Sequence, residues 1–374
     1  MMKKLSLTSW VLILSIGALF LLFWLLPARD YSATEKRYLA NPPTVTWESL
    51  LSGDVSRDVE DYLTDHFPGR NLFVGVHAYW NLLTGRNAVG SVYHCGDGYL
   101  IRAPEQGSLD TLDKNVTRFA AFAETSGLPA TLIVVPTAGS VLEDLLPANH
   151  DAYPDDEAME HVFRLAGNLE VLDLRELFQA EKTNTQLYYK TDHHLTSAGC
   201  YTVYCAYCRS QGLTPLPKTA YTILRSSGFK GTGWSSSGYW LTPADSLELW
   251  QSGDSLTVTI IEAGSEDVVS DSPFFLENLS ADDQYTVFLD GNHTLVTIEN
   301  PNAATDERLL VLRDSFGHCT APFLASDYAE IVLVDLRYYR ASVSQLIQDH
   351  GITRLMFLYG MDSMLTDTNS AWLS

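Results

Sequence analysis

Residues 309–316 read Leu-Leu-Val-Leu-Arg-Asp-Ser-Phe, and this stretch decides the fold class of the chain. Its four apolar residues are typical of a strand that is buried on both faces of a parallel sheet. A Gly-containing segment that can begin a helix follows Phe316. In a strand–helix connection of this kind, the residues after the strand lie at the carboxyl edge of the sheet, where ligands bind. The pattern therefore predicts that Ser315 is exposed at this edge.

A second short segment carries the partners that a serine nucleophile needs. Residues 191–194 read Thr-Asp-His-His, which places a carboxylate two residues before an imidazole. A nucleophilic serine needs an imidazole to take its proton and a carboxylate to hold that imidazole in the right tautomer. If the segment is extended, Asp192 and His194 point to one face and His193 points away. Together the two segments predict a triad of Ser315, His194 and Asp192.

The residues also leave two alternatives open. His318 follows Ser315 by three residues, about one helical turn, and is a rival general base. A metal site formed by Asp192, His193 and His194 is the other alternative, although no further ligand with a typical metal-site spacing can be named. The triad interpretation requires neither a metal ion nor another cofactor.

Strands and helices alternate over most of the chain. This pattern predicts an α/β domain with a mainly parallel sheet and helices on both faces. Ser108 can cap a helix that runs to Thr125, and Thr196 can cap another that runs to Gln211. Further helices are expected after Ser315 and Ser342. The apolar segments that predict strands of this sheet are residues 130–136, 169–174, 309–312, 330–334 and 353–358.

Residues 228–300 differ from the rest because they are rich in Gly, Ser, Thr and Asp. Their short alternating segments predict a small antiparallel insertion or sheet edge. The Asp-Gly-Asn sequence at 290–292 then forms a hairpin turn between the last two of these strands. The strands expected here are residues 247–250, 256–261, 285–289 and 295–298.

The N-terminus predicts a membrane segment. An uncharged run of 22 residues, Leu5 to Leu26, follows Lys3 and Lys4. This length spans a bilayer as a helix and exceeds the apolar core of a typical signal peptide. The two lysines favour a cytoplasmic N-terminus. We therefore expect a single-pass anchor with the bulk of the chain outside the cytoplasm, and cleavage near residues 32–34 is the alternative.

The composition limits the partners and the role of the cysteines. A formal net charge of −22 excludes the overall basic surface that nucleic-acid binding requires. Cys205 and Cys208 have the spacing of half a zinc site, but no second pair completes it. The five cysteines are expected to pack as small apolar side chains, without a disulfide framework.

Several of these segments together resemble the bacterial DHHW proteins. The segments that carry the resemblance are residues 65–70, 191–196, 288–293, 313–316 and 331–339. Leu195 stands where the name-giving Trp of the family is expected. DHHW proteins are related to the alginate O-acetyltransferases of the AlgX and AlgJ type, which implies an SGNH-hydrolase-like fold. By this resemblance Ser315 is similar to the nucleophile, His194 to the general base and Asp192 to its orienting acid.

An acyl-transfer site also needs fixed donors for the oxyanion. The backbone N–H of Ser315 is the first candidate. Gly291 and Asn292 resemble the Gly and Asn blocks that complete this hole in SGNH enzymes, and the hairpin turn described above is the alternative. Arg313 is a candidate contact for an anionic substrate group, with a solvated arginine at the strand end as the alternative.

Residues and resemblance together lead to three expected parts. These are a cytoplasmic tip and anchor (1–27), a stalk with an amphipathic helical segment (28–90), and an extracytoplasmic SGNH-hydrolase-like domain (91–374) with an insertion at about 228–300. The expected reaction adds or removes acetyl groups on a cell-envelope polysaccharide through acyl-Ser315. A membrane-bound protein that donates the acyl group is a further expected partner. The alternative is a catalytically inactive module of the same fold that binds glycan or helps envelope assembly.

Overall fold

The computed structural model describes residues 6–262 and 264–373, which form two compact units. Unit 1 contains the chain up to residue 89 together with residues 235–240, and unit 2 contains residues 90–234 and the chain from 241 onwards. Lys3, Lys4 and Leu5 lie outside the described residues. The orientation that they predict therefore stays a prediction.

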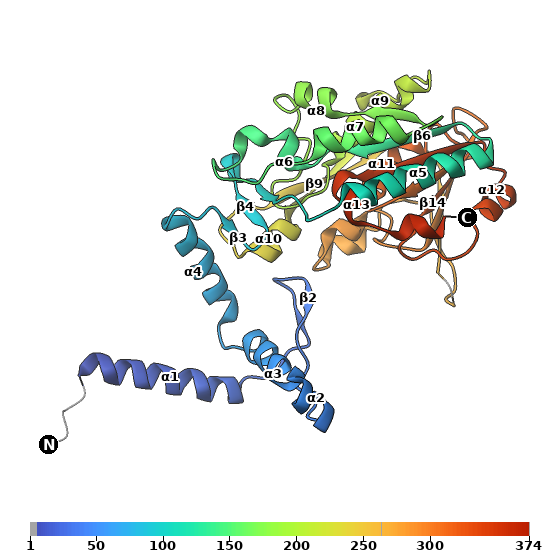
Figure 1. Cartoon of the computed structure of the whole chain (residues 1–374). Helices are drawn as coiled ribbons and strands as arrows, with labels where there is room; N and C mark the ends of the chain where they lie inside the picture. The colour runs from blue at the N-terminus through green and yellow to red at the C-terminus, as the bar shows by residue number, and fades with distance from the viewer. Residues whose placement is uncertain (1–5, 263, 374) are drawn as a thin grey trace. The chain divides into compact units, whose positions relative to one another are not determined.

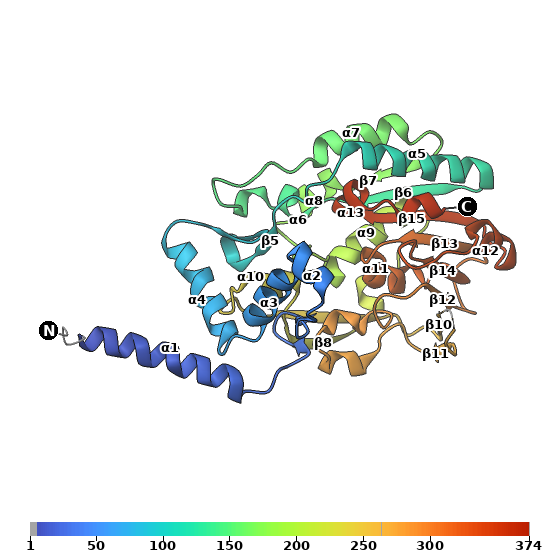
Figure 2. The same cartoon turned by 60° about the horizontal axis from the view of Figure 1, so that its bottom comes forward.

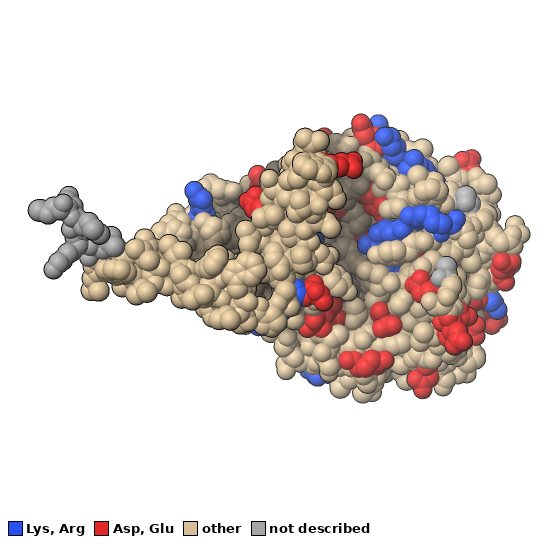
Figure 3. Space-filling model, turned by 90° about the horizontal axis from the view of Figure 1, so that it is seen from below, with Lys and Arg blue, Asp and Glu red and all other residues tan. Residues whose placement is uncertain are grey.

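Unit 1 begins with an apolar helix, α1 (Leu7–Leu25), inside the predicted run. It carries no charged side chain, as Figure 3 shows, and it is long and apolar enough to cross a membrane by length and composition. A signal sequence would meet the same criterion. Gly53, with φ of 83°, divides the amphipathic stretch that follows into two helices. The other elements of unit 1 are β1 (Tyr31–Ser32), β2 (Arg37–Tyr38), α2 (Trp47–Ser52), α3 (Asp54–Asp65), α4 (Arg70–Leu83) and β3 (Ala88–Val89).

Unit 2 is built on an eight-stranded sheet (Figures 1 and 2). Five strands run parallel in the order β14-β13-β15-β6-β7, and the antiparallel strands β12, β10 and β11 continue the sheet beyond β14. All five predicted strands are present, with ends that differ by two residues or fewer. The parallel strands are β6 (Ala130–Val135), β7 (Glu170–Asp173), β13 (Arg308–Arg313), β14 (Glu330–Val334) and β15 (Arg354–Gly360).

Helices cover both faces of this sheet, as predicted. Figure 2 shows α5 and α7 on one face and α9 and α11 on the other. Ser108 caps α5, and Gly127, with φ of 68°, ends it. On this face Phe119 of α5 stacks on Phe357 of β15 with ring centroids 4.5 Å apart. The helices of unit 2 are α5 (Leu109–Ser126), α6 (Ala138–Val141), α7 (Asp155–Leu165), α8 (Arg175–Glu181), α9 (Ser197–Ser210), α11 (Phe316–Leu324), α12 (Val343–Asp349) and α13 (Met361–Thr366).

The region 228–300 is antiparallel, as predicted, but part of it extends the main sheet. Strands β10 (Thr257–Ile261), β11 (Val268–Ser270) and β12 (Leu295–Glu299) join that sheet, whereas β9 (Asp245–Gln251) pairs with β8 (Thr222–Phe229) in a sheet of two strands. A hairpin of β4 (Val92–His94) and β5 (Leu100–Arg102) precedes α5, and α10 (Thr232–Ser237) follows β8.

The predicted strand at 285–289 is wrong. Gln284–Val287 form a short 3-10 helix, η5, and Leu289 and Asp290 have positive φ angles of 55° and 59°. The predicted hairpin at 290–292 is therefore also wrong, because β12 pairs with β10 and β14 instead. The apolar residues of this segment are buried without belonging to a strand, so the pattern was produced by burial alone.

All five cysteines are free and buried, as predicted. Three of them lie on α9, whose first turn is capped by the Thr196 hydroxyl. Burial raises the pKa of Cys208 and of Cys319, so these thiols are unreactive packing groups.

Candidate active site

Ser315 lies at the carboxyl end of β13, in the turn that begins α11. Strand β13 ends at Arg313, and Ser315 is the half-buried N-cap residue of the helix. Asp314 holds this turn against β15, because its carboxylate accepts the backbone N–H of Phe316 at 2.9 Å and that of Gly360 at 2.8 Å. The strand-to-helix turn predicted from the sequence is therefore present.

The structure brings Ser315, His194 and Asp192 together. The Nε2 atom of His194 lies 2.8 Å from Ser315 Oγ, and its Nδ1 atom lies 2.5 Å from Asp192 Oδ1. The side chains of His194 and Asp192 are only 8% and 2% exposed. The Ser315 hydroxyl lies on one side of the imidazole. The Asp192 carboxylate lies on the other side and fixes the tautomer of that imidazole.

The Asp192–His194 segment reaches this geometry through a turn and not through the extended conformation expected from the sequence. Asp192 Oδ1 also accepts the backbone N–H of His194 at 2.9 Å, a local bond that competes with strand pairing. Asp192 Oδ2 accepts the N–H and the hydroxyl of Thr232 at 2.7 and 3.1 Å. A Cβ atom at Gly231 would collide with Asp192, so glycine is required for this approach.

The ionised form of the Asp192 carboxyl is strongly favoured. Burial raises the pKa of its carboxyl, but the imidazoles of His194 and His193 outweigh burial and hold this pKa well below its usual range. The bonds from Thr232 act in the same direction. Asp192 is therefore an anion at neutral pH, and it can stabilise a positive charge on His194.

His193 does not point away from its neighbours, contrary to the expectation for an extended segment. Its ring lies 3.9 Å from that of His194 by centroid, and its Nδ1 atom lies 2.9 Å from Thr232 Oγ1. Burial and the adjacent His194 lower the pKa of His193, so the ring is neutral at neutral pH. One potential ligand atom from each of Asp192, His193 and His194 lies within 4.8 Å of the others, a spacing that is also compatible with the metal alternative.

His318, the rival base, lies in the interior. Its Nε2 atom accepts a hydrogen bond from Arg313 Nη1 at 2.6 Å, and the residue is 2% exposed. Burial and the Arg313 cation hold the pKa of His318 well below its usual value. Among the described residues, no hydrogen bond joins its ring to Ser315. The geometry therefore favours His194 over His318 as the partner of the serine.

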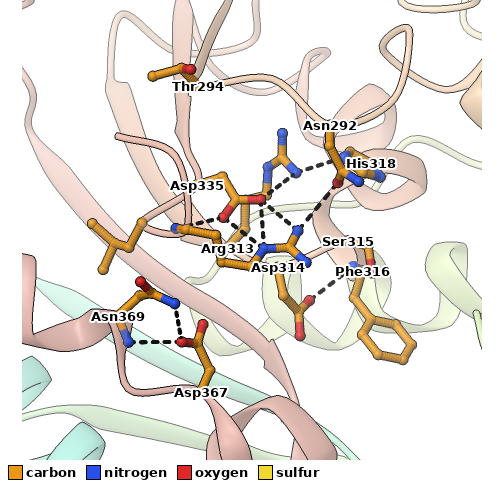
Figure 4. A network of polar contacts seen from close by, with 12 residues as sticks. Asn292, Thr294, Arg313, Asp314, Ser315, Phe316, His318, Asp335, Asp367 and Asn369 are labelled. Carbon is orange, nitrogen blue, oxygen red and sulfur yellow. Dashed lines mark hydrogen bonds and ion pairs between the residues drawn. The ribbon is translucent and has the colours of Figure 1, made fainter. Parts of the chain in front are cut away.

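Arg313 is fully buried behind Ser315 and is not a solvated arginine at the strand end. Its guanidinium lies 3.5 Å from Asp335 Oδ2, in the network shown in Figure 4. The side chain fits only because residue 317 is glycine: a Cβ there would approach the Arg313 methylenes to 2.9 Å. The structure thus does not bring Arg313 to the exposed edge where we expected a substrate contact.

Asn292 is held at the end of the same network. Asp335 accepts from Arg337 Nε at 2.9 Å and Nη2 at 2.6 Å, and Arg337 Nη2 also donates to Asn292 Oδ1 at 3.2 Å. Figure 4 shows the amide of Asn292 on the side of the network where His318 and Ser315 lie. Because Arg337 occupies the amide oxygen, the amide nitrogen is left to donate elsewhere. The N–H of Gly291 instead donates to Phe288 within its own turn.

Sequence reasoning missed two residues that shape the site. Tyr285 of η5 stacks on His194 with centroids 4.0 Å apart and planes at 12°, so that the imidazole lies between the rings of Tyr285 and His193. Thr232 holds Asp192 from the start of α10. Both come from the Gly- and Ser-rich region, and no spacing in the sequence connects them to residues 191–194.

Comparisons with known proteins agree with this fold. The profile of the DHHW proteins matches residues 83–334. A DHHW family protein from Eubacterium siraeum superposes with a TM-score of 0.66 at 23% identity, over 76% of this chain and 95% of that one. PatB1 of Bacillus cereus with a sulfonyl adduct gives 0.62 at 19% identity, over 76% and 98%. The O-acetyltransferase domain of Pseudomonas putida AlgJ gives 0.45 at 14% identity, over 75% and 95%. The search of curated proteins gave no match.

The expected fold class, an SGNH-hydrolase-like α/β sheet with an antiparallel region and an apolar N-terminal helix, is confirmed. The matched residues span about two thirds of the sequence and contain both Asp192-His193-His194 and Ser315. The chain therefore belongs to the DHHW family.

Proposed function

We propose that this protein is a membrane-anchored serine acyltransferase or esterase that acts on O-acetyl groups of a cell-envelope polysaccharide outside the cytoplasm. The observation that carries the proposal is the hydrogen-bonded chain from Asp192 through His194 to Ser315. Its position at the carboxyl edge of a mainly parallel sheet adds support, since this is where α/β folds bind ligands. The polysaccharide itself comes from the resemblance to the alginate O-acetyltransferases.

In the first half of the reaction, Ser315 Oγ attacks the acyl carbon of the donor while His194 Nε2 takes the hydroxyl proton. The negative charge moves to the carbonyl oxygen, for which the N–H of Ser315 and the amide of Asn292 are the proposed donors. When the carbonyl re-forms, the bond to the donor alcohol breaks and His194 gives its proton to that alcohol. The acyl group is then an ester of Ser315.

In the second half, a sugar hydroxyl or water gives its proton to His194 and attacks the acyl carbon. Ser315 leaves and recovers the proton, so the enzyme returns to its starting state. Asp192 stays ionised throughout and stabilises the transient imidazolium, which is consistent with its low pKa. Transfer and hydrolysis differ only in which hydroxyl attacks.

The sulfonyl adduct of PatB1 suggests a chemical probe. Sulfonyl fluorides attach to activated nucleophiles, of which a serine hydroxyl beside a base is a common example. We expect phenylmethylsulfonyl fluoride to modify this chain at one residue, Ser315, whose hydroxyl displaces fluoride from the reagent.

The decisive test is the incubation of the purified full-length protein with 4-nitrophenyl acetate, followed by intact mass. We expect the mass of one acetyl group to be added, and Ser315→Ala to abolish the addition. Ser344→Ala is the matched control, because Ser344 is exposed on α12 far along the chain from the site. Labelling that persists in Ser315→Ala would refute the proposed nucleophile, and no labelling of the wild type would favour a glycan-binding module without catalysis.

The proposed membrane anchoring and orientation of the protein can be tested separately. Helix α1 supports membrane association, and we propose that it is an uncleaved anchor with the chain from residue 28 onwards outside the cytoplasm. A phosphatase that is active only outside the cytoplasm, fused after the last residue, should be active and remain with the membrane fraction. Activity of a reporter that works only in the cytoplasm would contradict this orientation.

A further inference from the structure

A small cavity adjoins the proposed triad at the carboxyl edge of the sheet in unit 2. It has a volume of about 30 Å³. Asp192 and His193 line it from one side, and Phe316, the residue after Ser315, lines it from another. The end of β6, strand β5 and the start of α13 close it, and Asp362 is the acidic residue that α13 contributes.

The carboxyl of Asp362, in the first turn of α13, is a polar group that lines this cavity. The residue is half-buried, and among the described residues no hydrogen bond to its side-chain oxygens is found. Burial together with Glu105 and Asp155 raises the pKa of Asp362 to about 7, against the opposing effect of Arg102. Asp314 contributes to this rise, so this carboxyl holds its proton below about pH 7 and can then both donate and accept.

The size and chemistry of the cavity limit its occupant. About 10 to 15 Å³ of such volume holds one water molecule, so the cavity accepts a group of two or three heavy atoms and not a sugar ring. Leu100, Val135 and Met361 supply apolar lining, which suits a methylene. A neutral carboxyl suits a hydroxyl. Arg102 also lines the cavity, but the acidic residues Glu105, Asp155 and Asp314 act against its charge, so the surroundings do not favour an anion.

The cavity is not the place where the acyl group binds. The acyl carbonyl must lie at Ser315 Oγ and His194 Nε2, and neither residue lines the cavity. A short arm on the adjacent substrate ring can still enter, because His193, whose ring contacts His194, forms part of the wall.

Resting on the proposed function, we propose that this cavity binds the hydroxymethyl arm of a hexose unit in the polysaccharide and that Asp362 hydrogen-bonds its hydroxyl. Asp362 then determines specificity for hexose polymers over polymers of pentoses, which lack this arm. Its role is in binding the sugar and not in forming the acyl-enzyme.

Three oligosaccharides test this without the identity of the natural polymer. Cellohexaose and xylohexaose share the β-1,4 backbone and differ by the hydroxymethyl arm, and chitohexaose adds a second polymer with that arm. We expect the full-length wild type to bind at least one of the hexose oligomers roughly 3- to 10-fold more tightly than xylohexaose, as one hydrogen bond predicts. Isothermal titration calorimetry measures this directly.

Variants of Asp362 then test whether this residue causes the difference in affinity between hexose and pentose oligomers. Asp362→Ala should bind the hexose and pentose oligomers equally, and Asp362→Asn, which keeps a donor and an acceptor, should retain part of the difference. Asp306→Ala is the control, because Asp306 is exposed and precedes β13 at the opposite end of that strand. Equal binding of all oligomers by the wild type, absence of binding, or unchanged discrimination in Asp362→Ala would overturn the proposal.

A parallel measurement distinguishes failure of this proposal from failure of the proposed function. 4-Nitrophenyl acetate has no hydroxymethyl arm, so Asp362→Ala should form the acyl-enzyme within about twofold of the wild-type rate. Loss of acylation in this variant would mean that Asp362 supports the triad and not a sugar. No acylation in the wild type refutes only the proposed catalysis, because the calorimetry still decides on the sugar site.

Discussion

The ring of Tyr285 lies almost flat against the imidazole of His194, with 4.0 Å between their centroids and 12° between their planes. The bonds to Asp192 and Ser315 fix His194 within the plane of its ring, and the stack prevents it from tilting out of that plane. Tyr285 is therefore a positioning residue for the proposed base.

Replacement of Tyr285 should lower the rate of acylation through this positioning. We expect Tyr285→Ala to slow the 4-nitrophenol burst by about tenfold or more, because small misplacements of a catalytic group are costly. Tyr285→Phe keeps the ring and should remain within about twofold of wild type. Equal losses in both variants would mean that the hydroxyl, and not the stack, matters.

The two adjacent histidines should behave differently. His194→Ala should cost about 10²-fold or more in rate, as loss of a general base does, because only His194 contacts Ser315 Oγ. His193→Ala and His318→Ala should cost much less. Stopped-flow measurement of the burst decides this, with melting temperatures recorded to detect unfolding. Equal losses at His193 and His194 would count against the triad.

Asp192→Asn should fall close to the His194 variant. An amide cannot hold the imidazole as the tautomer that accepts the serine proton, and it removes the negative charge opposite the imidazolium. A loss of about 10²- to 10⁴-fold in kcat is expected. Activity that disappears with a chelator and returns with zinc would show instead that Asp192, His193 and His194 bind a metal.

Arg337 offers a test of the proposed oxyanion donor. It fixes Asn292 through the amide oxygen while Asp335 fixes Arg337. We expect Arg337→Met to lower kcat by about tenfold with little change in KM, since the donor acts on the transition state. Asn292→Ala should give a similar loss, and the double variant should lose little more. Additive losses would show that the two residues act independently, and Arg225→Ala, an exposed arginine, is the control.

The sequence predicted those parts of the site that depend on local pattern. The apolar run at 309–312 favoured a buried strand, and the edge position of Ser315 followed from that strand, which the structure contains. The short spacing of Asp192 and His194 also limited how far apart they could lie, even though the expected extended conformation was wrong.

The remaining parts depend on packing between distant segments. Arg313 is buried because Gly317 leaves space for its side chain and Asp335 balances its charge. The sequence around an arginine at a strand end does not show either of these contacts. Tyr285 reaches His194 through a 3-10 helix whose alternating apolar residues imitate a strand. Asp362 lies two residues after the end of β15, and its significance arises only from the cavity that other segments close.

Asp362 also makes the stability of the protein depend on pH in a defined direction. Its folded-state pKa of about 7 lies above the ordinary value of 3.8, with burial as the main cause. The unfolded chain therefore loses this proton first, and the contribution of Asp362 to stability falls as the pH rises from about 4 through 7. Asp362→Asn has no proton to lose and should escape this effect.

At pH 4 the variant and the wild type should melt at similar temperatures. At pH 8 the variant should be more stable by roughly 1 to 2 kcal/mol, about 2 to 4 °C, after allowance for the partial exposure of the carboxyl. Thermal melts of the full-length protein at both pH values, with Asp306→Asn as the control, measure the difference. A gain that is the same at both pH values would show that the charge of Asp362 is not its cause.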